Sequence, residues 1–482
     1  MTLPAASVAE VRPGSGSDNN GGGYVTGSSG TDYSQQASAQ YALSGLTTSG
    51  ASATVSTASA TSDMVGNWTQ ITAGTNFTTG IYNVASVVVG SSITFDRNVA
   101  TGVGAAGTAN VGGALATITK AEGVLVAGNT AWLKADGTNQ TISSSIILSN
   151  PGDQTSGVIT WQGYHTTRGD HDGTRPLITT ATNNLMMIKD NASVTLNFRV
   201  FDNIDFSTTA GTPGYAFVPG FNRTTANWRI SNCKLSGHKA AILSDNSIAF
   251  AISNLICDGL EVTGGADGII IANTSRIMNC YIHGNTGAGI KIPSMGVSGV
   301  NGYTVRNCVF YSNATGINLT SAAGSSATSG SMIDVGHCDF VSQTSDGIVS
   351  AIANGNFFGL LLQNSIFWGN GGYGVNDTNS AAFIVANRNN AYGSNTSGAR
   401  NNLAAGSGDV TLTADPFTAR TSNDFSLNST AGGGAACKAA GFPGSLPGLV
   451  TAGFADGGAL QSQAAAGGAN RAALPSGLSA LG

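Results

Sequence analysis

A short motif recurs through the second half of the chain, and its spacing limits the possible folds more than any other feature. The segments IMNCYIHGNTGAGIKI (277–292) and VRNCVFYSNATGINLT (305–320) are two copies. In each, a small or apolar residue is followed two positions later by a larger apolar one. The first position is occupied, at intervals of 20 to 30 residues, by Ile204, Cys233, Leu260, Cys280, Cys308, Cys338 and Ser365. A repeat of this length indicates a solenoid of stacked coils.

Another apolar position follows seven or eight residues after the larger residue of the motif. Its occupants are Ile242, Ile269, Ile290, Ile317, Ile348 and Val375. The apolar segments are too short for helices, the 3.6-residue period of an amphipathic helix does not occur between them, and the dense leucine of leucine-rich repeats is missing. The pattern therefore predicts an all-β fold, a right-handed parallel β-helix with two or three short strands in each coil.

Changes in composition divide the chain into five parts. Residues 1–31 are rich in Gly, Ser and Asn and predict an extended N-terminal arm. The next part, 32–122, predicts a short helix at 32–43 followed by a small antiparallel β-meander that begins near residue 64. The β-helix is expected over 123–418, a closing segment over 419–462 and a flexible tail over 463–482.

The overall composition excludes several classes of function. With 68 Gly, 9% charged residues and a net charge of −5, the chain has no basic patch for nucleic acid or an anionic membrane. No N-terminal segment has the pattern of a secretory signal, and no apolar run reaches the roughly 18 residues of a membrane span. We therefore expect synthesis and assembly in the cytosol.

The cysteines recur with the repeat. Cys233, Cys280, Cys308 and Cys338 occupy the same motif position, which predicts one column of small inward side chains in the core. Disulfides and a metal site remain alternatives, but stacked parallel side chains give poor disulfide geometry, and the C-x₂-C pairs typical of zinc sites do not occur. We expect structural cysteines, no metal and no cofactor.

Carboxylates are the residues to consider for sugar-cleaving chemistry, which needs two carboxyl groups about 5 to 9.5 Å apart. Asp267 and Asp346 stand before equivalent Gly-apolar turns, but three rungs separate them, or roughly 14 Å. Asp170 and Asp172 lie in the charged segment RGDHDGTRP (168–176), which resembles part of a calcium loop without its downstream Glu. All four aspartates are weak catalytic candidates, and turn formation is the alternative for each.

Aromatic and cationic side chains that face outward could bind sugars. Tyr311, Trp368 and Tyr373 are candidates for exposed aromatic side chains, and their rings could stack on sugar rings. Arg168 could donate hydrogen bonds to a glycan from its charged turn. The outward part of the coil around Tyr311 and Asn313 is where we expect function to lie.

With the repeat in place, the chain resembles the parallel β-helix proteins of bacteriophage particles. The resemblance rests on the first coils, GVLVAGNTAWLKADGTNQTISSSIILS (123–149) and ITWQGYHTTRGDHDGTRPLIT (159–179). It rests also on the closing segment LTADPFTARTSNDFSLNSTAGGGAACKAAGFPG (412–444) and on the N-terminal part. The paired Asp, His-Gly and Arg-x-Lys elements of pectin-hydrolysing β-helix enzymes are missing from the sequence.

This resemblance implies a virion surface protein, a tailspike, fibre or capsid-decorating spike. Proteins of this kind are homotrimers that attach to other virion proteins by the N-terminal region and present the rod to host polysaccharide. Two alternatives remain open at this point. One is a polysaccharide depolymerase, either a hydrolase or a lyase, with its site in a groove of the β-helix. The other is a bacterial surface adhesin, which would require export.

Overall fold

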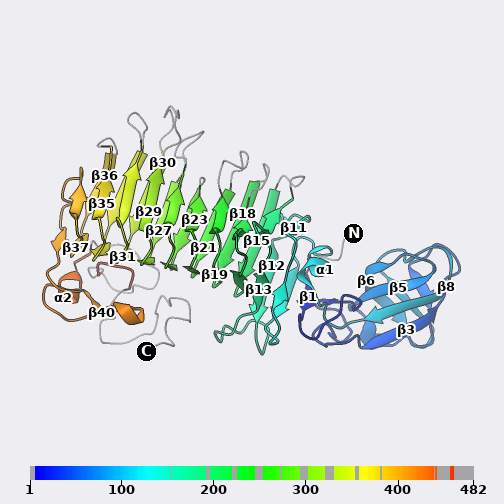
Figure 1. The fold of residues 1–482 in the computed structure, drawn as a ribbon. Helices are drawn as coiled ribbons and strands as arrows, with labels where there is room; N and C mark the ends of the chain where they lie inside the picture. The colour runs from blue at the N-terminus through cyan, green and yellow to red at the C-terminus, as the bar shows by residue number, and fades with distance from the viewer. Residues whose placement is uncertain are drawn as a thin grey trace. The chain divides into compact units, whose positions relative to one another are not determined.

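The protein is described from a computed structural model that is almost entirely β (Figure 1). The described residues are 6–153, 155–191, 196–219, 225–244, 253–271, 274–293, 302–320, 331–352, 358–379, 383–438, 440–441 and 456–460. The expected tail at 463–482 lies outside them. The chain forms two compact units, 1–179 with 193–205 and 180–192 with 206–482.

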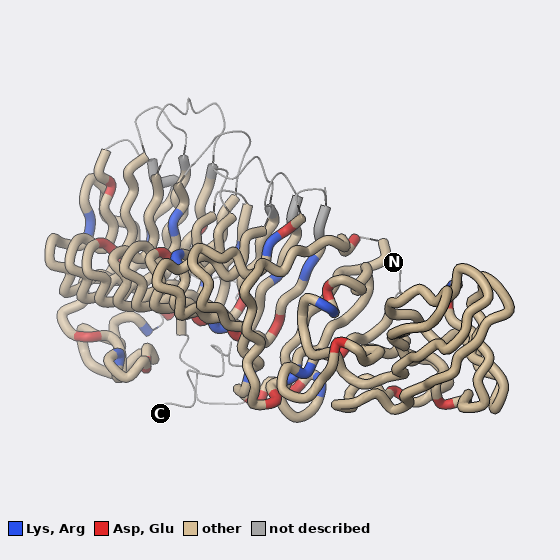
Figure 2. The backbone as a smooth tube through the Cα atoms, turned by 45° about the vertical axis from the view of Figure 1, so that its right-hand side comes forward, with Lys and Arg blue, Asp and Glu red and all other residues tan. Residues whose placement is uncertain are grey.

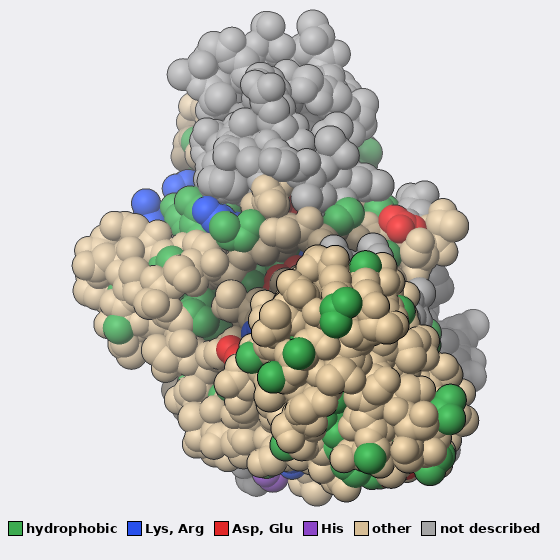
Figure 3. All heavy atoms as spheres, turned by 90° about the vertical axis from the view of Figure 1, so that its right-hand side faces the viewer, with side chains coloured by type: hydrophobic (Ala, Val, Ile, Leu, Met, Phe, Trp, Pro, Cys, Tyr) green, Lys and Arg blue, Asp and Glu red, His purple; other side chains and the backbone are tan. Residues whose placement is uncertain are grey.

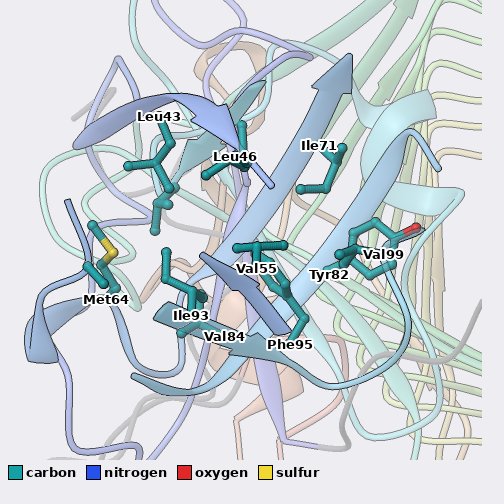
Figure 4. Close-up of a cluster of buried hydrophobic side chains, with 13 residues drawn as sticks. Leu43, Leu46, Val55, Met64, Ile71, Tyr82, Val84, Ile93, Phe95 and Val99 are labelled. Atoms are coloured by element: carbon teal, nitrogen blue, oxygen red, sulfur yellow. The ribbon is translucent and has the colours of Figure 1, made fainter. Parts of the chain in front are cut away.

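The first unit contains a six-stranded antiparallel sheet in the order β3-β8-β5-β6-β7-β4. Its elements are β3 (Tyr41–Leu46), β4 (Thr54–Ser56), η1 (Ser62–Met64), β5 (Trp68–Phe77), β6 (Gly80–Val88), β7 (Ser92–Phe95) and β8 (Ala100–Val111). One face of this sheet buries a cluster that includes Leu46, Ile71 and Phe95 (Figure 4). The antiparallel meander expected from the sequence is therefore present.

Two expectations for the N-terminal part are wrong. Residues 32–40 form turns and no helix, because β3 pairs with β8, about 65 residues further along the chain. The supposed arm contains β1 (Ser7–Val11), which pairs in parallel with β9 (Thr130–Lys134), and β2 (Gly23–Val25), which pairs with β1 in antiparallel fashion. Both differences come from strand pairings that are distant in sequence, which local composition does not reveal.

The first unit also holds the beginning of the β-helix. Its elements are α1 (Ile118–Glu122), β10 (Gln140–Thr141), β11 (Ile146–Leu148), β12 (Ile159–Tyr164), β13 (Leu177–Thr180) and β15 (Leu196–Asp202). From α1, the buried Glu122 receives two hydrogen bonds from Arg199, at 2.6 and 3.2 Å, and one from the indole of Trp161 at 3.1 Å. A fully buried ion pair thus joins the helix to the inward faces of β12 and β15.

The second unit is a right-handed parallel β-helix whose coils contribute strands to three sheets, each named here by the strands from β14 and β16 onward that this unit supplies. Sheet 1 consists of β18 (Thr225–Ser231), β21 (Ser253–Asp258), β24 (Ser275–Met278), β27 (Gly302–Arg306), β30 (Ser331–Gly336), β33 (Phe358–Gln363) and β36 (Phe383–Arg388). Sheet 2 consists of β16 (Asp205–Thr208), β19 (Lys234–Ser236), β22 (Glu261–Thr263), β25 (Tyr281–His283), β28 (Val309–Tyr311), β31 (Asp339–Val341), β34 (Ile366–Trp368), β37 (Ala391–Gly393) and β39 (Val410–Thr411). Sheet 3 consists of β14 (Met186–Asp190), β17 (Tyr215–Val218), β20 (Ala240–Ser244), β23 (Asp267–Ile271), β26 (Ala288–Ile292), β29 (Thr315–Thr320), β32 (Ile348–Ala351), β35 (Tyr373–Asp377) and β38 (Gly398–Asn401).

The corner between sheets 1 and 2 requires a left-handed backbone. The residue there has a φ between 53° and 55° in six coils, at Asn232, Asn279, Asn307, His337, Asn364 and Asn389. Asparagine tolerates this conformation better than most residues with a side chain. The corner therefore explains the Asn that precedes the cysteine position in most copies of the motif.

The core is built of columns in which equivalent residues stack from coil to coil. In sheet 2 the inward column runs Leu235, Val262, Ile282, Phe310, Phe340, Phe367 and Tyr392. The rings of Phe310 and Phe340 stack with centroids 4.8 Å apart, as do those of Phe340 and Phe367. In sheet 3 the column continues through all six apolar positions marked in the sequence, from Ile242 to Val375.

A polar column runs inside the turn between sheets 2 and 3. It consists of Asn285, Asn313, Gln343, Asn370 and Asn395, each of whose side-chain oxygens accepts a backbone amide hydrogen bond from the preceding coil. Asn313 is fully buried in it, so the expectation that this residue faces outward is wrong. A buried amide is stable here because the column satisfies its donors and acceptors.

Candidate functional site

The cysteines lie in the core of the coils. Cys233, Cys280, Cys308 and Cys338 are buried and hold equivalent places just before sheet 2, where backbone hydrogen bonds link each coil to the next. All six cysteines of the chain are free thiols. Burial raises the pKa of the Cys308 thiol well above its ordinary value, so this thiol stays protonated. The thiols of Cys233, Cys280, Cys308 and Cys338 fill space at the corners of their coils.

The two aspartates of the equivalent turns lie on sheet 3, three rungs apart. Asp267 accepts a hydrogen bond from the amide of Ala288 at 2.9 Å and contacts Lys291 Nζ at 3.4 Å, both in the next coil. Asp346 accepts hydrogen bonds from the amide of Tyr373 at 2.6 Å and from the side chain of Asn376 at 2.9 Å. Each carboxylate therefore bridges its own coil to the next.

The charged segment 168–176 is held by its own turn and by the N-terminal strands. Asp170 accepts hydrogen bonds from the amides of residues 165–167, and Asp172 contacts His165 Nδ1 at 2.8 Å. Arg168 donates to Glu10 at 2.9 Å and to Asp32 at 3.1 Å. Within the described part of the chain, no group of three or more His, Cys, Asp or Glu side chains could hold a metal ion.

The closing part of the chain covers the outer face of sheet 2. We call it the C-terminal segment, comprising β40 (Phe417–Ala419), η3 (Arg420–Ser422), β41 (Asp424–Leu427), α2 (Gly434–Cys437) and residues 456–460. Together with the sheet it buries an apolar cluster that contains Tyr281, Val309, Val341, Ile366, Trp368, Ala391, Leu412, Phe417, Phe425, Cys437 and Ala459.

The C-terminal segment limits the exposure of two of the three aromatic residues predicted to bind glycans. Trp368 is 8% exposed in the apolar cluster, and its burial does not fit a role in stacking on a sugar. The ring of Tyr311 is partly buried against Phe425, with ring centroids 5.3 Å apart. Tyr373 lies half-buried on sheet 3 beside Asp346.

Beyond the C-terminal segment, the outer face of sheet 2 carries a polar cluster that the sequence did not reveal. Lys, Arg, Asp and Glu residues are sparse along the coils (Figure 2), yet a lysine, a glutamate and a histidine lie on consecutive rungs here. Lys234 Nζ and His283 Nε2 approach the same oxygen, Oε1 of Glu261, at 2.8 and 3.4 Å. We call these three residues the Glu261 ledge.

The Glu261 ledge is both accessible and fixed in place. The side chains of Lys234, Glu261 and His283 are 40%, 16% and 22% exposed. The ring of Tyr281 stacks on His283 with centroids 4.1 Å apart, and its hydroxyl donates to Asn423 of the C-terminal segment at 2.8 Å. One face of the His283 imidazole therefore stacks on the Tyr281 ring, which fixes its position, while the side chain remains partly exposed to solvent.

The electrostatics of the ledge keep its carboxylate charged. Burial alone would raise the pKa of Glu261, but hydrogen bonds from His283 and Lys234 outweigh it and lower the pKa to about 2. A group with this pKa is not a general acid near neutral pH, because it holds no proton to give. The ledge is suited to binding a ligand through hydrogen bonds.

Where Figure 3 shows it, the surface of the protein is polar but mostly uncharged. On the face drawn in Figure 3, hydrophobic side chains are scattered singly among polar uncharged ones. None of the helices in the described residues has the length and hydropathy of a membrane span.

Comparisons with known proteins give likenesses of structure only. No protein-family model and no curated protein matches the chain. Pectate lyase Pel9A is 12% identical with a TM-score of 0.44, over 73% of this chain and 92% of its own. The catalytic domain of a GH87 alpha-1,3-glucanase is 9% identical with a TM-score of 0.27, over 82% and 92%. The tailspike protein gp49 from Pseudomonas phage LKA1 is 12% identical with a TM-score of 0.21, over 74% and 61%. At these values they indicate neither a ligand nor a reaction for this chain.

Proposed function

We propose that this chain is a structural protein of a bacteriophage surface, whose β-helix is a rigid support that contacts host glycans at the Glu261 ledge. The observation that carries the proposal is the ledge itself, a fixed and ionised carboxylate flanked by an ammonium group and an imidazole. Both neighbours contact Oε1, so among the described residues Oε2 of Glu261 is left to accept hydrogen bonds from a ligand.

Sugar hydroxyls suit such a ledge. Neighbouring hydroxyl groups of a pyranose can each donate and accept, and charge-assisted hydrogen bonds to a carboxylate and an ammonium are stronger than neutral ones. Because the three side chains come from β19, β22 and β25, the regular spacing of the coils fixes the distances between them. The stacked coils thus hold the binding groups in position before the ligand arrives, which lowers the entropy lost on binding.

The rest of the proposal follows the resemblance seen in the sequence. We propose that the chain assembles as a homotrimer, and that its N-terminal antiparallel sheet attaches it to other virion proteins. The low pKa of Glu261 argues against a general-acid role for this residue in cleavage. A polysaccharide depolymerase remains the alternative outcome of the test below, and an exported adhesin is the alternative to a virion location.

Glycan binding is tested by titrating the purified full chain with capsule or lipopolysaccharide fragments of the host in a calorimeter. Glu261→Gln removes the charge and weakens both bonds within the ledge, so we expect the affinity to fall at least tenfold. Asp267→Asn is the matched control, since Asp267 forms an equivalent pair with Lys291 on sheet 3. The control variant should bind like the wild type.

Two results would contradict the proposal. Equal affinities of Glu261→Gln and the wild type would show that the ledge does not bind the glycan. Release of reducing or unsaturated sugar ends during the titration, abolished in Asp267→Asn or Asp346→Asn, would identify a depolymerase with its site on sheet 3.

A further inference from the structure

Asp339 is a carboxylic acid in an apolar place. It lies on the outer face of β31, in register between Val309 of β28 and Ile366 of β34, and is 1% exposed under the C-terminal segment. Neither of its oxygens has a hydrogen-bond partner among the described residues, and no described Lys, Arg or His forms an ion pair with it. Burying an unpaired carboxylate is strongly unfavourable, whereas the neutral acid is tolerated far better.

One glycine of the C-terminal segment, Gly458, closes over this carboxyl, and Gly457 precedes it against Cys437 and Ile366. A Cβ atom at Gly458, which has a φ of +96°, would lie 2.5 Å from Asp339 Oδ1. The amide of Gly458 donates to the carbonyl of Asn364 at 2.8 Å, and that of Gly457 donates to the carbonyl of Cys437 at 2.9 Å. The amide of Ala459 faces the carboxyl without forming a hydrogen bond of normal geometry. The cover therefore fits closely over the Asp339 side chain.

The titratable groups around Asp339 do not compensate a negative charge. From α2, Cys437 has a pKa raised to about 12 by burial and by Asp339 and Asp456, so its thiol is neutral. At the corner before β31, burial and Arg306 lower the pKa of His337 to about 4.

The remaining neighbours are acidic, neutral or already paired. Asp456 of the C-terminal segment is itself an acid, and Tyr311 of β28 is a phenol. Arg420 of η3 donates to Asp415 at 2.7 Å and to Ser342 at 2.8 Å. An ionised Asp339 would thus add a charge to an apolar cluster in which no described residue supplies a cation for it.

We propose that the C-terminal segment is a proton-dependent latch: it docks on sheet 2 while Asp339 is protonated and is released when Asp339 ionises. Release would uncover the apolar outer face of β28, β31 and β34. This inference is independent of glycan binding, because it rests on the burial of Asp339 under the C-terminal segment and not on the Glu261 ledge.

The direction of the pH dependence follows from burial. Desolvation raises the pKa of Asp339 well above its ordinary value, near 3.9 when exposed. The docked state therefore binds the proton more tightly than the released state. Docking is strongest in acid and weakens by up to tenfold per pH unit between the exposed and the docked pKa.

Cys437 provides a native reporter for release. It is 1% exposed when the segment is docked, while the other five cysteines lie in the core of the coils and mark global unfolding. The full chain is treated with N-ethylmaleimide at pH 5 to 8, and the modified cysteines are identified by mass spectrometry. At each pH, the rate of Cys437 modification in the wild type is divided by the rate of Cys437 modification in the Asp339→Asn variant. This ratio cancels the effect of pH on the ionisation of the thiol itself.

We expect this ratio to rise with pH, by up to tenfold per unit, while the core thiols stay unmodified. Asp424→Asn removes an exposed charge from the same segment and should leave the wild-type profile unchanged. Gly458→Ala should expose Cys437 at every pH, because its Cβ would collide with Asp339. A pH-independent ratio, or a Cys437 modified no sooner than the core thiols, would overturn the latch.

Discussion

At the scale of single residues, the backbone conformation and the burial of each position in the coil determine which residue types occur there. The corner asparagines tolerate a left-handed backbone, and the amides of the polar column satisfy one another inside the coil. The alternation of these positions with apolar ones could be read from the sequence. The direction of an individual polar side chain could not, because Asn313 and Tyr311 are both plausible outward residues until the turn geometry is known. Only Asn313 points into the core.

The corner makes a prediction about Asn307, whose φ is 54°. Asn307→Ala places a less tolerant residue in the left-handed region and should lower the free energy of unfolding by about 1–2 kcal/mol. Asn307→Gly allows the same φ without strain and should differ from the wild type by less than Ala does. Urea denaturation of both variants measures this. If Asn307→Gly lowers the free energy of unfolding as much as Asn307→Ala does, the backbone conformation does not explain the preference for Asn at this position. The side-chain hydrogen bond from Asn307 to Asn279 at 3.3 Å would then explain it.

At the scale of the elements, the periodic part of the chain was predictable and the non-periodic part was not. The apolar positions from Ile242 to Val375 pair in sheet 3 as their spacing requires. The pairing of β1 with β9 joins residues more than a hundred positions apart, so no local pattern announces it. The Glu261 ledge was not predicted from the sequence either. Its signal was present, since Lys234 and Glu261 each directly precede an inward residue of the column in sheet 2.

The pairing of α1 with β15 through Glu122 and Arg199 makes a prediction at this scale. Glu122→Gln leaves the buried guanidinium without its counter-charge and should lower the free energy of unfolding by about 3–5 kcal/mol. The double variant Glu122→Leu, Arg199→Met removes both charges and should be closer to the wild type in stability. Guanidinium denaturation of Glu122→Leu, of Arg199→Met and of the double variant gives the coupling free energy between the two side chains. Additive losses would show that the two charges do not depend on each other.

At the scale of the whole molecule, the fold restricts where function can lie. Among the described residues the interior of the coils is filled by apolar columns and by the polar column, so the outer faces of the three sheets are the surfaces that a ligand can reach there. Sheet 2 is covered by the C-terminal segment from β25 onward and carries the Glu261 ledge beside that cover. The stacked coils therefore hold a fixed set of polar groups on a regular support.

The most direct test of this account is immunogold electron microscopy of purified particles from bacteria that carry the gene, with an antibody raised against the full chain. We expect gold on the outside of intact virions, in clusters consistent with several copies at each position. Virions without label, together with antigen found only in the host cytosol or on the bacterial envelope, would contradict a virion surface protein.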